Sequence, residues 1–177
     1  MNPKLEEAFD GLLGVPSWNV KQGHGSFLTF EFGQPSLVID EVRHHETYPT
    51  FPATRSRLVT PRGEWHLWIY CCSWTIRQEG YGLAHSESSR EEIEMACRVL
   101  AGQALTTVEP VPLTRKAGFI FDLGGILETR GEGYSAEDVS WMLYRPDRLV
   151  FSYRHDGCYS FGSPKSNDEW QVLPNAG

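Results

Sequence analysis

The sequence has few cysteines and no long apolar run, and each of these absences excludes a class of protein. Its four cysteines, Cys71, Cys72, Cys97 and Cys158, match neither a zinc site nor a secreted disulfide framework. No apolar segment approaches the ~20 residues that a membrane helix needs, and the N-terminus lacks the pattern of a signal peptide. We therefore expect a cytoplasmic protein with reduced thiols and no membrane-spanning segment.

Basic residues are also scarce, because 16 lysines and arginines stand against 23 aspartates and glutamates, giving a net charge of −7. Nucleic-acid binding needs a surface rich in lysine and arginine, and this sequence has no dense basic cluster. We therefore expect no nucleic-acid partner. An acidic surface maintains solubility, and it would also attract a basic protein partner at long range.

Motifs for catalysis or cofactor binding are missing as well. Asp122 lies in the stretch Phe121–Gly125 (FDLGG), which lacks both the Gly-x-Gly-x-x-Gly pattern and the phosphate-loop lysine. Its two glycines favour a tight hairpin in which Asp122 accepts hydrogen bonds from local backbone amides. His24 sits between two glycines and near a serine, without a Gly-x-Ser-x-Gly elbow. We predict no catalytic residue, no metal site and no cofactor.

Two other groups of reactive side chains have simpler explanations. A nucleophilic thiol needs a base beside it, but six residues of extended strand would place Cys72 about 20 Å from His66. Core packing therefore explains the cysteines better. His44 and His45, followed by Glu46, lack the His-x-x-x-His spacing of a metal site, so they are interpreted as polar loop residues that contact a partner.

The sequence contains mainly strand signals. The run from Gly63 to Arg77 holds three of the six tryptophans, and it is interpreted as one strand in the middle of a sheet, apolar on both faces. Helices are predicted after Asn2, which precedes a proline, and after Ser89, which begins a capping box. The remaining strands are predicted over residues 18–22, 26–32, 36–42, 58–60, 104–109, 117–123, 126–129, 139–144, 149–154 and 159–161.

Together these elements predict an α+β fold, with a large, curved, mainly antiparallel sheet or partial barrel and two helices. The length favours one domain over residues 1–177, with a polar tail from about residue 162. Short links favour a meander of the first three strands, and a hairpin that joins 58–60 to the tryptophan-rich strand. Residues 43–57 are the longest irregular stretch, and 79–88 are predicted as a loop.

Three stretches resemble an uncharacterised family of small bacterial proteins: Gly23–Gly33 (GHGSFLTFEFG), His66–Trp74 (HLWIYCCSW) and Phe121–Gly125 (FDLGG). The resemblance spans roughly residues 14–130. Such proteins look like those of bacterial toxin–immunity loci, where small acidic cytoplasmic proteins neutralise toxins by binding. The resemblance implies a class of role and assigns no catalytic residue.

The preferred hypothesis is a non-enzymatic acidic binding protein, an immunity protein that neutralises a basic toxin by occlusion. The partner-binding candidates are Glu31, Asp40, Glu41, His44, His45, Glu46, Tyr48, Trp68 and Tyr70. The alternative is a small-molecule-binding protein or hydrolase with a pocket inside the curved sheet, where His24, His66 and Asp122 are the candidate polar groups. A third hypothesis is a structural subunit of a larger assembly. The sequence does not define the oligomeric state.

Overall fold

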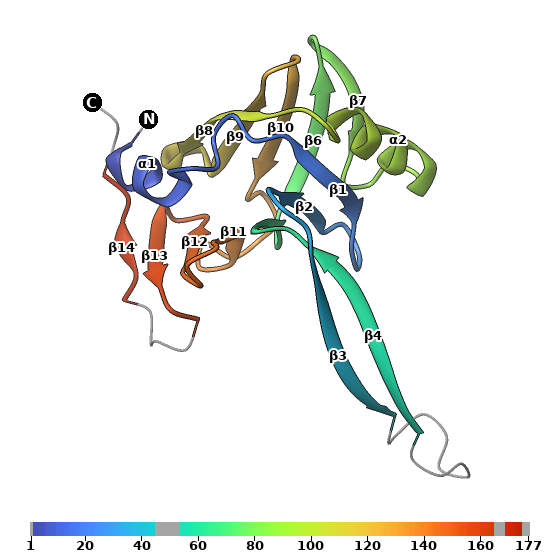
Figure 1. Cartoon of the computed structure of the whole chain (residues 1–177). Helices are drawn as coiled ribbons and strands as arrows, with labels where there is room; N and C mark the ends of the chain where they lie inside the picture. Colours follow the sequence, from blue (N-terminus) through green and yellow to red (C-terminus); the bar gives the residue numbers. More distant parts are fainter. Residues whose placement is uncertain (1, 45–53, 165–168, 175–177) are drawn as a thin grey trace.

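Most of the chain forms antiparallel strands, arranged as two facing sheets and a separate ribbon (Figure 1). The computed structural model describes residues 2–44, 54–164 and 169–174. Within them, the larger sheet has the order β1 (Ser17–Gln22), β2 (Leu28–Phe32), β5 (Trp65–Ile69), β11 (Val139–Tyr144), β12 (Val150–Arg154), β13 (Cys158–Gly162) and β14 (Gln171–Val172). The smaller sheet has the order β7 (Tyr81–His85), β6 (Ser73–Gln78), β10 (Gly125–Arg130), β9 (Lys116–Phe121) and β8 (Leu105–Val111).

The ribbon pairs β3 (Ser36–His44) with β4 (Thr54–Arg62), and the helices in the described residues are α1 (Pro3–Phe9), α2 (Arg90–Leu100) and a short 3₁₀ turn at Pro112–Thr114. The predicted α+β fold with mainly antiparallel sheet and two α-helices is therefore confirmed.

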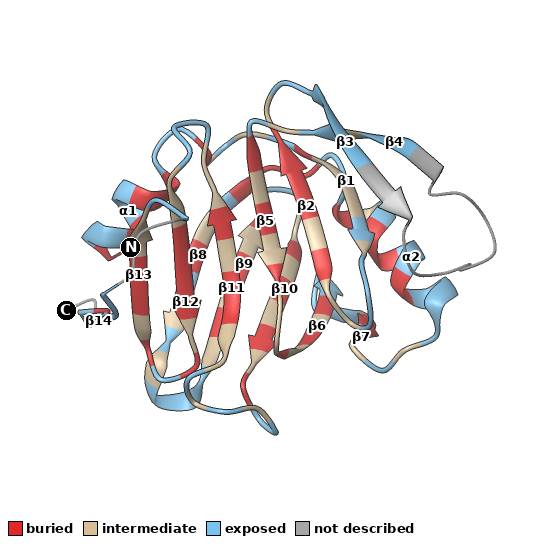
Figure 2. Cartoon of the chain, turned by 90° about the horizontal axis from the view of Figure 1, so that it is seen from below, coloured by how far each residue is buried: buried red, intermediate tan, exposed pale blue. Residues whose placement is uncertain are grey.

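The two sheets pack through their inner faces, where aromatic rings meet. Phe30 of β2 stacks on Phe121 of β9 at 6.0 Å between ring centroids, and Phe119 meets Trp141 of β11 edge-on at 5.5 Å. Along the strands, buried residues alternate with more exposed ones, as Figure 2 shows. Apolar side chains fill the space between the sheets.

Both α-helices begin where the sequence predicts. Asn2 accepts a hydrogen bond from the backbone of Lys4, and Ser89 exchanges both capping-box hydrogen bonds with Glu92. The apolar spacing of Leu5, Ala8, Phe9, Leu12 and Leu13 predicts a helix that continues to Leu13, but α1 ends at Phe9 and the next residues form turns.

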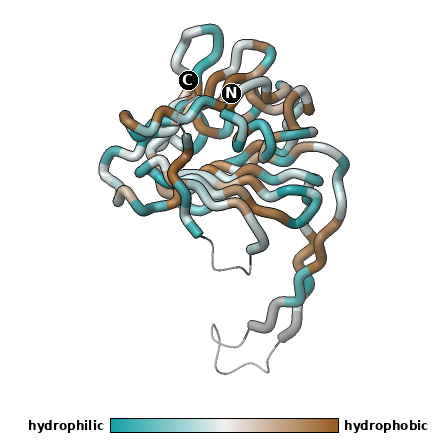
Figure 3. Tube along the Cα trace, turned by 90° about the vertical axis from the view of Figure 1, so that its left-hand side faces the viewer, coloured by the Kyte–Doolittle hydropathy of each residue, from teal (hydrophilic) through white to brown (hydrophobic). Residues whose placement is uncertain are grey.

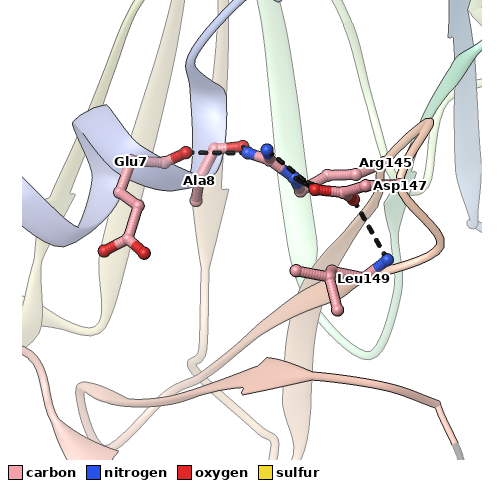
Figure 4. A network of polar contacts seen from close by, with 5 residues as sticks. All are labelled: Glu7, Ala8, Arg145, Asp147 and Leu149. Atoms are coloured by element: carbon pink, nitrogen blue, oxygen red, sulfur yellow. Dashed lines mark hydrogen bonds and ion pairs between the residues drawn. The ribbon is translucent and has the colours of Figure 1, made fainter.

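An arginine directly after β11 binds the C-terminal part of α1. The guanidinium of Arg145 donates to the carbonyl oxygens of Glu7 and Ala8, both at 2.7 Å, and pairs with Asp147 at 3.0 Å (Figure 4). These contacts satisfy carbonyl groups that a continuing helix would otherwise use. Arg145 also lies 5.1 Å above the ring of Trp65.

The tryptophan-rich run is two strands in different sheets, so the prediction of one long strand is wrong. Between β5 and β6 the chain turns a corner, where the amide of Tyr70 donates to Ser140 and that of Cys72 donates back to Tyr70. Buried residues are odd-numbered in β5 and even-numbered in β6. The run looks apolar on both faces because this corner shifts the alternation by one residue.

The predicted meander stops after its second strand. Gly33 has φ of +75°, and beyond it β3 leaves the sheet and pairs with β4 along nine residue pairs, from Ser36–Arg62 to His44–Thr54. The predicted hairpin between residues 58–60 and the tryptophan-rich strand is therefore wrong. The ends of the predicted irregular stretch belong to the ribbon strands, while residues 45–53 lie outside the described part of the chain.

The ribbon projects away from the outer face of the larger sheet, as Figures 1 and 3 show from two directions. Its position matters for function because its base lies over β2 and β5, while the rest extends beyond the body of the protein.

Two smaller segments also differ from the sequence prediction. Residues 79–88 are predicted as a loop, but they contain the edge strand β7. Ala84 is the only buried side chain of β7, so the sequence shows no alternating pattern there. In the polar tail, Trp170 and Val172 are the predicted anchors. The ring of Trp170 does lie 4.9 Å from the Arg154 guanidinium, but Leu173 is the buried side chain and Val172 is 74% exposed. In the described ranges no helix is long and apolar enough to span a bilayer.

Candidate functional site

Polar and aromatic side chains gather on the outer face of the larger sheet, where β2, β5 and β11 lie side by side. Antiparallel pairing sets Glu31 opposite His66 and His66 opposite Tyr144. One step along the strands, Thr29 lies opposite Trp68. Residues two apart on a strand point to the same face, so this register assembles one surface from three strands.

The centre of this surface is a hydrogen-bonded pair. Glu31 is only 2% exposed, and its Oε1 atom lies 2.9 Å from Nδ1 of His66. Its Oε2 atom accepts a hydrogen bond from the backbone N–H of Gly63 at 2.9 Å. The contact with Glu31 engages Nδ1 and fixes the orientation of the imidazole ring, so Nε2 is the ring nitrogen that Glu31 does not engage.

Gly63 makes this arrangement possible through the lack of a side chain. A Cβ atom at this position would lie 2.4 Å from the backbone oxygen of Phe32 and 2.8 Å from its nitrogen. Only glycine lets the turn between β4 and β5 approach β2 so closely. The close approach delivers the N–H group that holds Glu31 in place.

A pocket of about 320 Å³ lies beside the Glu31–His66 pair, and we call it the outer-face pocket. Burial raises the pKa of Tyr144, so its hydroxyl stays protonated and can donate a hydrogen bond. Besides the pair, the lining consists of two basic, two hydroxyl and two aromatic residues: Lys21, Arg62, Thr29, Thr60, Trp68 and Tyr144.

A second hollow, of about 560 Å³, lies between the β1–β2 hairpin and α2. Its rim carries the ion pair Arg90–Glu94, whose atoms are 2.9 Å apart on the exposed face of the helix. Lys21 borders both hollows. The second hollow is lined by exposed charged side chains and by backbone atoms. Its described lining residues include no buried polar pair comparable with Glu31 and His66.

The structure does not bring the three predicted pocket residues together. His66 lines the outer-face pocket, whereas His24 is exposed in the β1–β2 turn. Asp122 lies at the end of β9 in the other sheet and accepts a hydrogen bond from the amide of Ala104 at 2.7 Å. The expected acceptor role is present, but the amide comes from a segment 18 residues away rather than from the local turn.

The predicted partner-binding residues fall into several environments. Asp40 and Glu41 are exposed on the ribbon, where Glu41 pairs with Arg57 at 3.3 Å. Glu31 is buried in its pair with His66, so it does not present its charge to a partner. The half-buried aromatics Trp68 and Tyr70 lie on the outer face, His44 ends β3, and His45, Glu46 and Tyr48 lie outside the described residues.

Sequence reasoning missed five of the eight residues that line the outer-face pocket. It named Glu31 and His66 in separate roles, and it did not select Lys21, Thr29, Thr60, Arg62 or Tyr144 as lining residues. Alternation within 28–32 and 65–69 signals a polar face on each strand. No local signal shows that the base of the ribbon lies over that face.

The thiols do not provide a nucleophile in the ground state. Burial raises the pKa of Cys72 to about 12 and that of Cys97 to about 11, and the pKa values of Cys71 and Cys158 are raised for the same reason. All four cysteines are free. Thiols with raised pKa values stay protonated near neutral pH and react slowly.

We expect iodoacetamide at pH 8 to alkylate the half-buried Cys71 and Cys158 before the buried Cys72 and Cys97 in the native protein. The order follows because alkylation requires both the thiolate and access to it. Mass spectrometry of peptides after timed labelling measures the order, and labelling in urea provides the control in which all four react. Fast modification of Cys72 in the native protein would contradict this assignment.

Fold and site together define an antiparallel α+β protein with a projecting ribbon and a polar pocket at the base of that ribbon. In comparisons with known proteins, no family model, no curated protein and no solved structure matched the chain. Among the described residues, no three histidine, cysteine, aspartate or glutamate side chains gather as metal ligands.

Proposed function

We propose that this chain is a binding protein that engages a second protein through the ribbon β3–β4. The observation that carries the proposal is a group of large apolar side chains on the ribbon, with exposed fractions between 38 and 70%: Leu37, Val38, Ile39, Leu58 and Val59. Grouped apolar side chains on the surface of a soluble protein are typical of an interaction site. Figure 3 places this hydrophobic segment in the part of the ribbon nearest the body.

The pairing register arranges these side chains on both faces of the ribbon. Leu37 and Ile39 share one face with Val59 and Pro61, and Val38 lies on the other face. An isolated two-stranded ribbon is marginally stable in water, and its outer edges carry unpaired backbone groups. A partner that covers one apolar face would therefore stabilise the ribbon as well as bind it.

The charge of the ribbon defines the chemistry of the partner. The sequences of β3 and β4 contain four arginines and two carboxylates, a net charge of +2 with histidine neutral, which leaves −9 on the rest of the chain of net charge −7. A matching partner surface would be apolar with carboxylates at its rim. A basic toxin, the partner expected from the sequence, would instead be complementary in charge to the acidic body of the protein.

The biological role in this proposal is neutralisation by occlusion, as the resemblance to proteins of toxin–immunity loci implies. The ribbon would supply the apolar contact energy, and no chemical step by this chain is required. The alternative of a ligand pocket inside the sheet has no supporting observation, because the inner faces are filled with apolar side chains.

The variant Ile39→Asp is expected to abolish capture of the partner. Burying an isoleucine contributes about 1.5–3 kcal/mol, and burying an unpaired carboxylate is unfavourable, so affinity should fall at least a hundredfold. Wild-type and variant proteins would be immobilised and exposed to lysate of the source cell, and the bound proteins quantified by mass spectrometry.

The matched control is Met95→Asp, since Met95 is 67% exposed on α2, away from the ribbon. A protein captured by wild type and by Met95→Asp, but not by Ile39→Asp, supports the proposal. Equal capture by all three proteins contradicts it. If the captured protein is a second copy of this chain, the ribbon is an oligomer interface and the neutralising role is excluded.

A further inference from the structure

We propose that the outer-face pocket binds a small organic anion in which a phosphate or carboxylate is attached to a flat apolar ring. The inference is independent of protein binding by the ribbon. It rests on the buried Glu31–His66 pair, on the cationic side chains beside it and on the aromatic walls of the pocket.

The anionic group is recognised by three nitrogen-bearing side chains. Lys21 and Arg62 line the pocket, and neither forms an ion pair with a carboxylate of the described residues. Nδ1 of His66 is engaged by Glu31, and in the doubly protonated imidazolium Nε2 donates a hydrogen bond to the anion. The carboxylate of Glu31 is already occupied by two donors, so it orients His66 rather than repelling the ligand at the pocket surface.

The flat part of the ligand is recognised by aromatic walls. The ring centroid of His66 lies 5.7 Å from that of Tyr144 and 6.4 Å from that of Trp68. On its other side Trp68 contacts Phe27 and Tyr70, with centroids 6.3 and 5.2 Å away, so its ring is held in position. Rings held in this way stack on a flat ligand with little loss of conformational freedom.

One hydroxyl of the lining residues is buried without a partner in the described part of the chain. The Oγ1 atom of Thr29 is buried and has no hydrogen-bond partner among the described residues. Buried polar groups in proteins nearly always have a partner, and leaving one unsatisfied is unfavourable.

The size of the pocket limits the ligand to a small molecule. A volume of about 320 Å³ is at the lower end of the usual range for ligand sites. This space suits one ring with one charged group, and it does not suit a polymer. Arg62 and Thr60 come from the ribbon, so the ribbon base forms one wall of the pocket.

The experiment is a titration of the purified full-length protein with phenyl phosphate and, separately, with benzoate. Binding would be followed through the indole N–H signal of Trp68 by nuclear magnetic resonance, and its stoichiometry by calorimetry. Inorganic phosphate and phenol, which carry the charge alone and the ring alone, are expected to bind at least ten times more weakly than phenyl phosphate. Whichever of phenyl phosphate and benzoate binds with the higher affinity carries the preferred anionic group.

The variants Arg62→Gln and His66→Gln are each expected to weaken binding about tenfold or more, since each removes a charge-assisted hydrogen bond. The control Arg77→Gln removes an exposed arginine from the smaller sheet and should leave affinity unchanged. Arg62 is exposed, so that variant keeps the test valid if His66→Gln fails to fold.

Saturable one-to-one binding that Arg62→Gln weakens and Arg77→Gln leaves intact supports the site. The inference is overturned if neither aromatic anion shifts the Trp68 signal at 10 mM, about the weakest affinity a specific site of this kind would show. Equal weakening by Arg62→Gln and Arg77→Gln also overturns it, because binding would then reflect only the overall charge.

Discussion

Replacing Trp141 with alanine is expected to lower the free energy of unfolding by about 3–5 kcal/mol. Trp141 is fully buried on β11 and joins α1 to both sheets. Its ring contacts four aromatic neighbours at centroid distances of 5.2 to 5.9 Å: Phe9, Phe119, Phe151 and Tyr153. The substitution removes these contacts and leaves a cavity that rigid strands cannot close.

Urea denaturation followed by circular dichroism measures this loss without relying on tryptophan fluorescence. The matched control is Trp170→Ala, because Trp170 is 37% exposed on the C-terminal segment and contacts Arg154. The control substitution should lower the free energy of unfolding by at most about 1 kcal/mol. A similar cost for both variants would mean that Trp141 does not hold the two sheets together.

Gly63→Ala should destabilise the protein by about 1–3 kcal/mol and also weaken the outer-face pocket. The new methyl group would meet backbone atoms of Phe32, which cannot rotate away, so the turn between β4 and β5 must move outward. The N–H group of residue 63 then moves away from Glu31, which loses one of its two donors. Thermal unfolding measures the stability, and the phenyl phosphate titration measures the pocket.

Gly118→Ala is the control for this second substitution. Gly118 lies in β9, and a Cβ atom added there would have no neighbouring atom within 4 Å. Its replacement should leave stability equal or slightly higher, because alanine restricts the unfolded chain. If Gly63→Ala behaves in the same way, the close approach of the turn is not needed to hold Glu31.

Features that depend on neighbouring residues could be predicted from the sequence. The cap at Asn2, the capping box at Ser89 and the Gly124 hairpin each involve groups within about four residues, and all three are present. Strand alternation likewise located β8 to β13, whereas the two-residue strand β14, with both residues exposed, was not predicted. The edge strand β7 was missed because only one of its side chains is buried, which leaves no alternating pattern.

Features that depend on distant pairing could not be predicted in the same way. The corner at Tyr70–Cys72 depends on a hydrogen bond to Ser140, about 70 residues further along the chain, and short-range patterns contain no such information. The ribbon is a similar case, since β3 has the alternation of a sheet strand whether it pairs with β2 or with β4. Prediction of the pocket would have required two facts that local patterns do not contain: the pairing of Glu31 with His66 and the position of Arg62.

Because β2 pairs directly with β5, the ribbon is a separable segment of the chain. Phe32 lies opposite Trp65, so the chain leaves the sheet and returns to it at adjacent positions. The segment from Gly33 to Glu64 therefore connects two strand ends that a short hairpin turn could join. Exchange of this one segment would alter the apolar contact surface, and also Thr60 and Arg62 in the pocket wall. Replacement of this segment by a short turn would thus remove both proposed binding features at once, while the twelve strands of the body, within the described residues, keep their order.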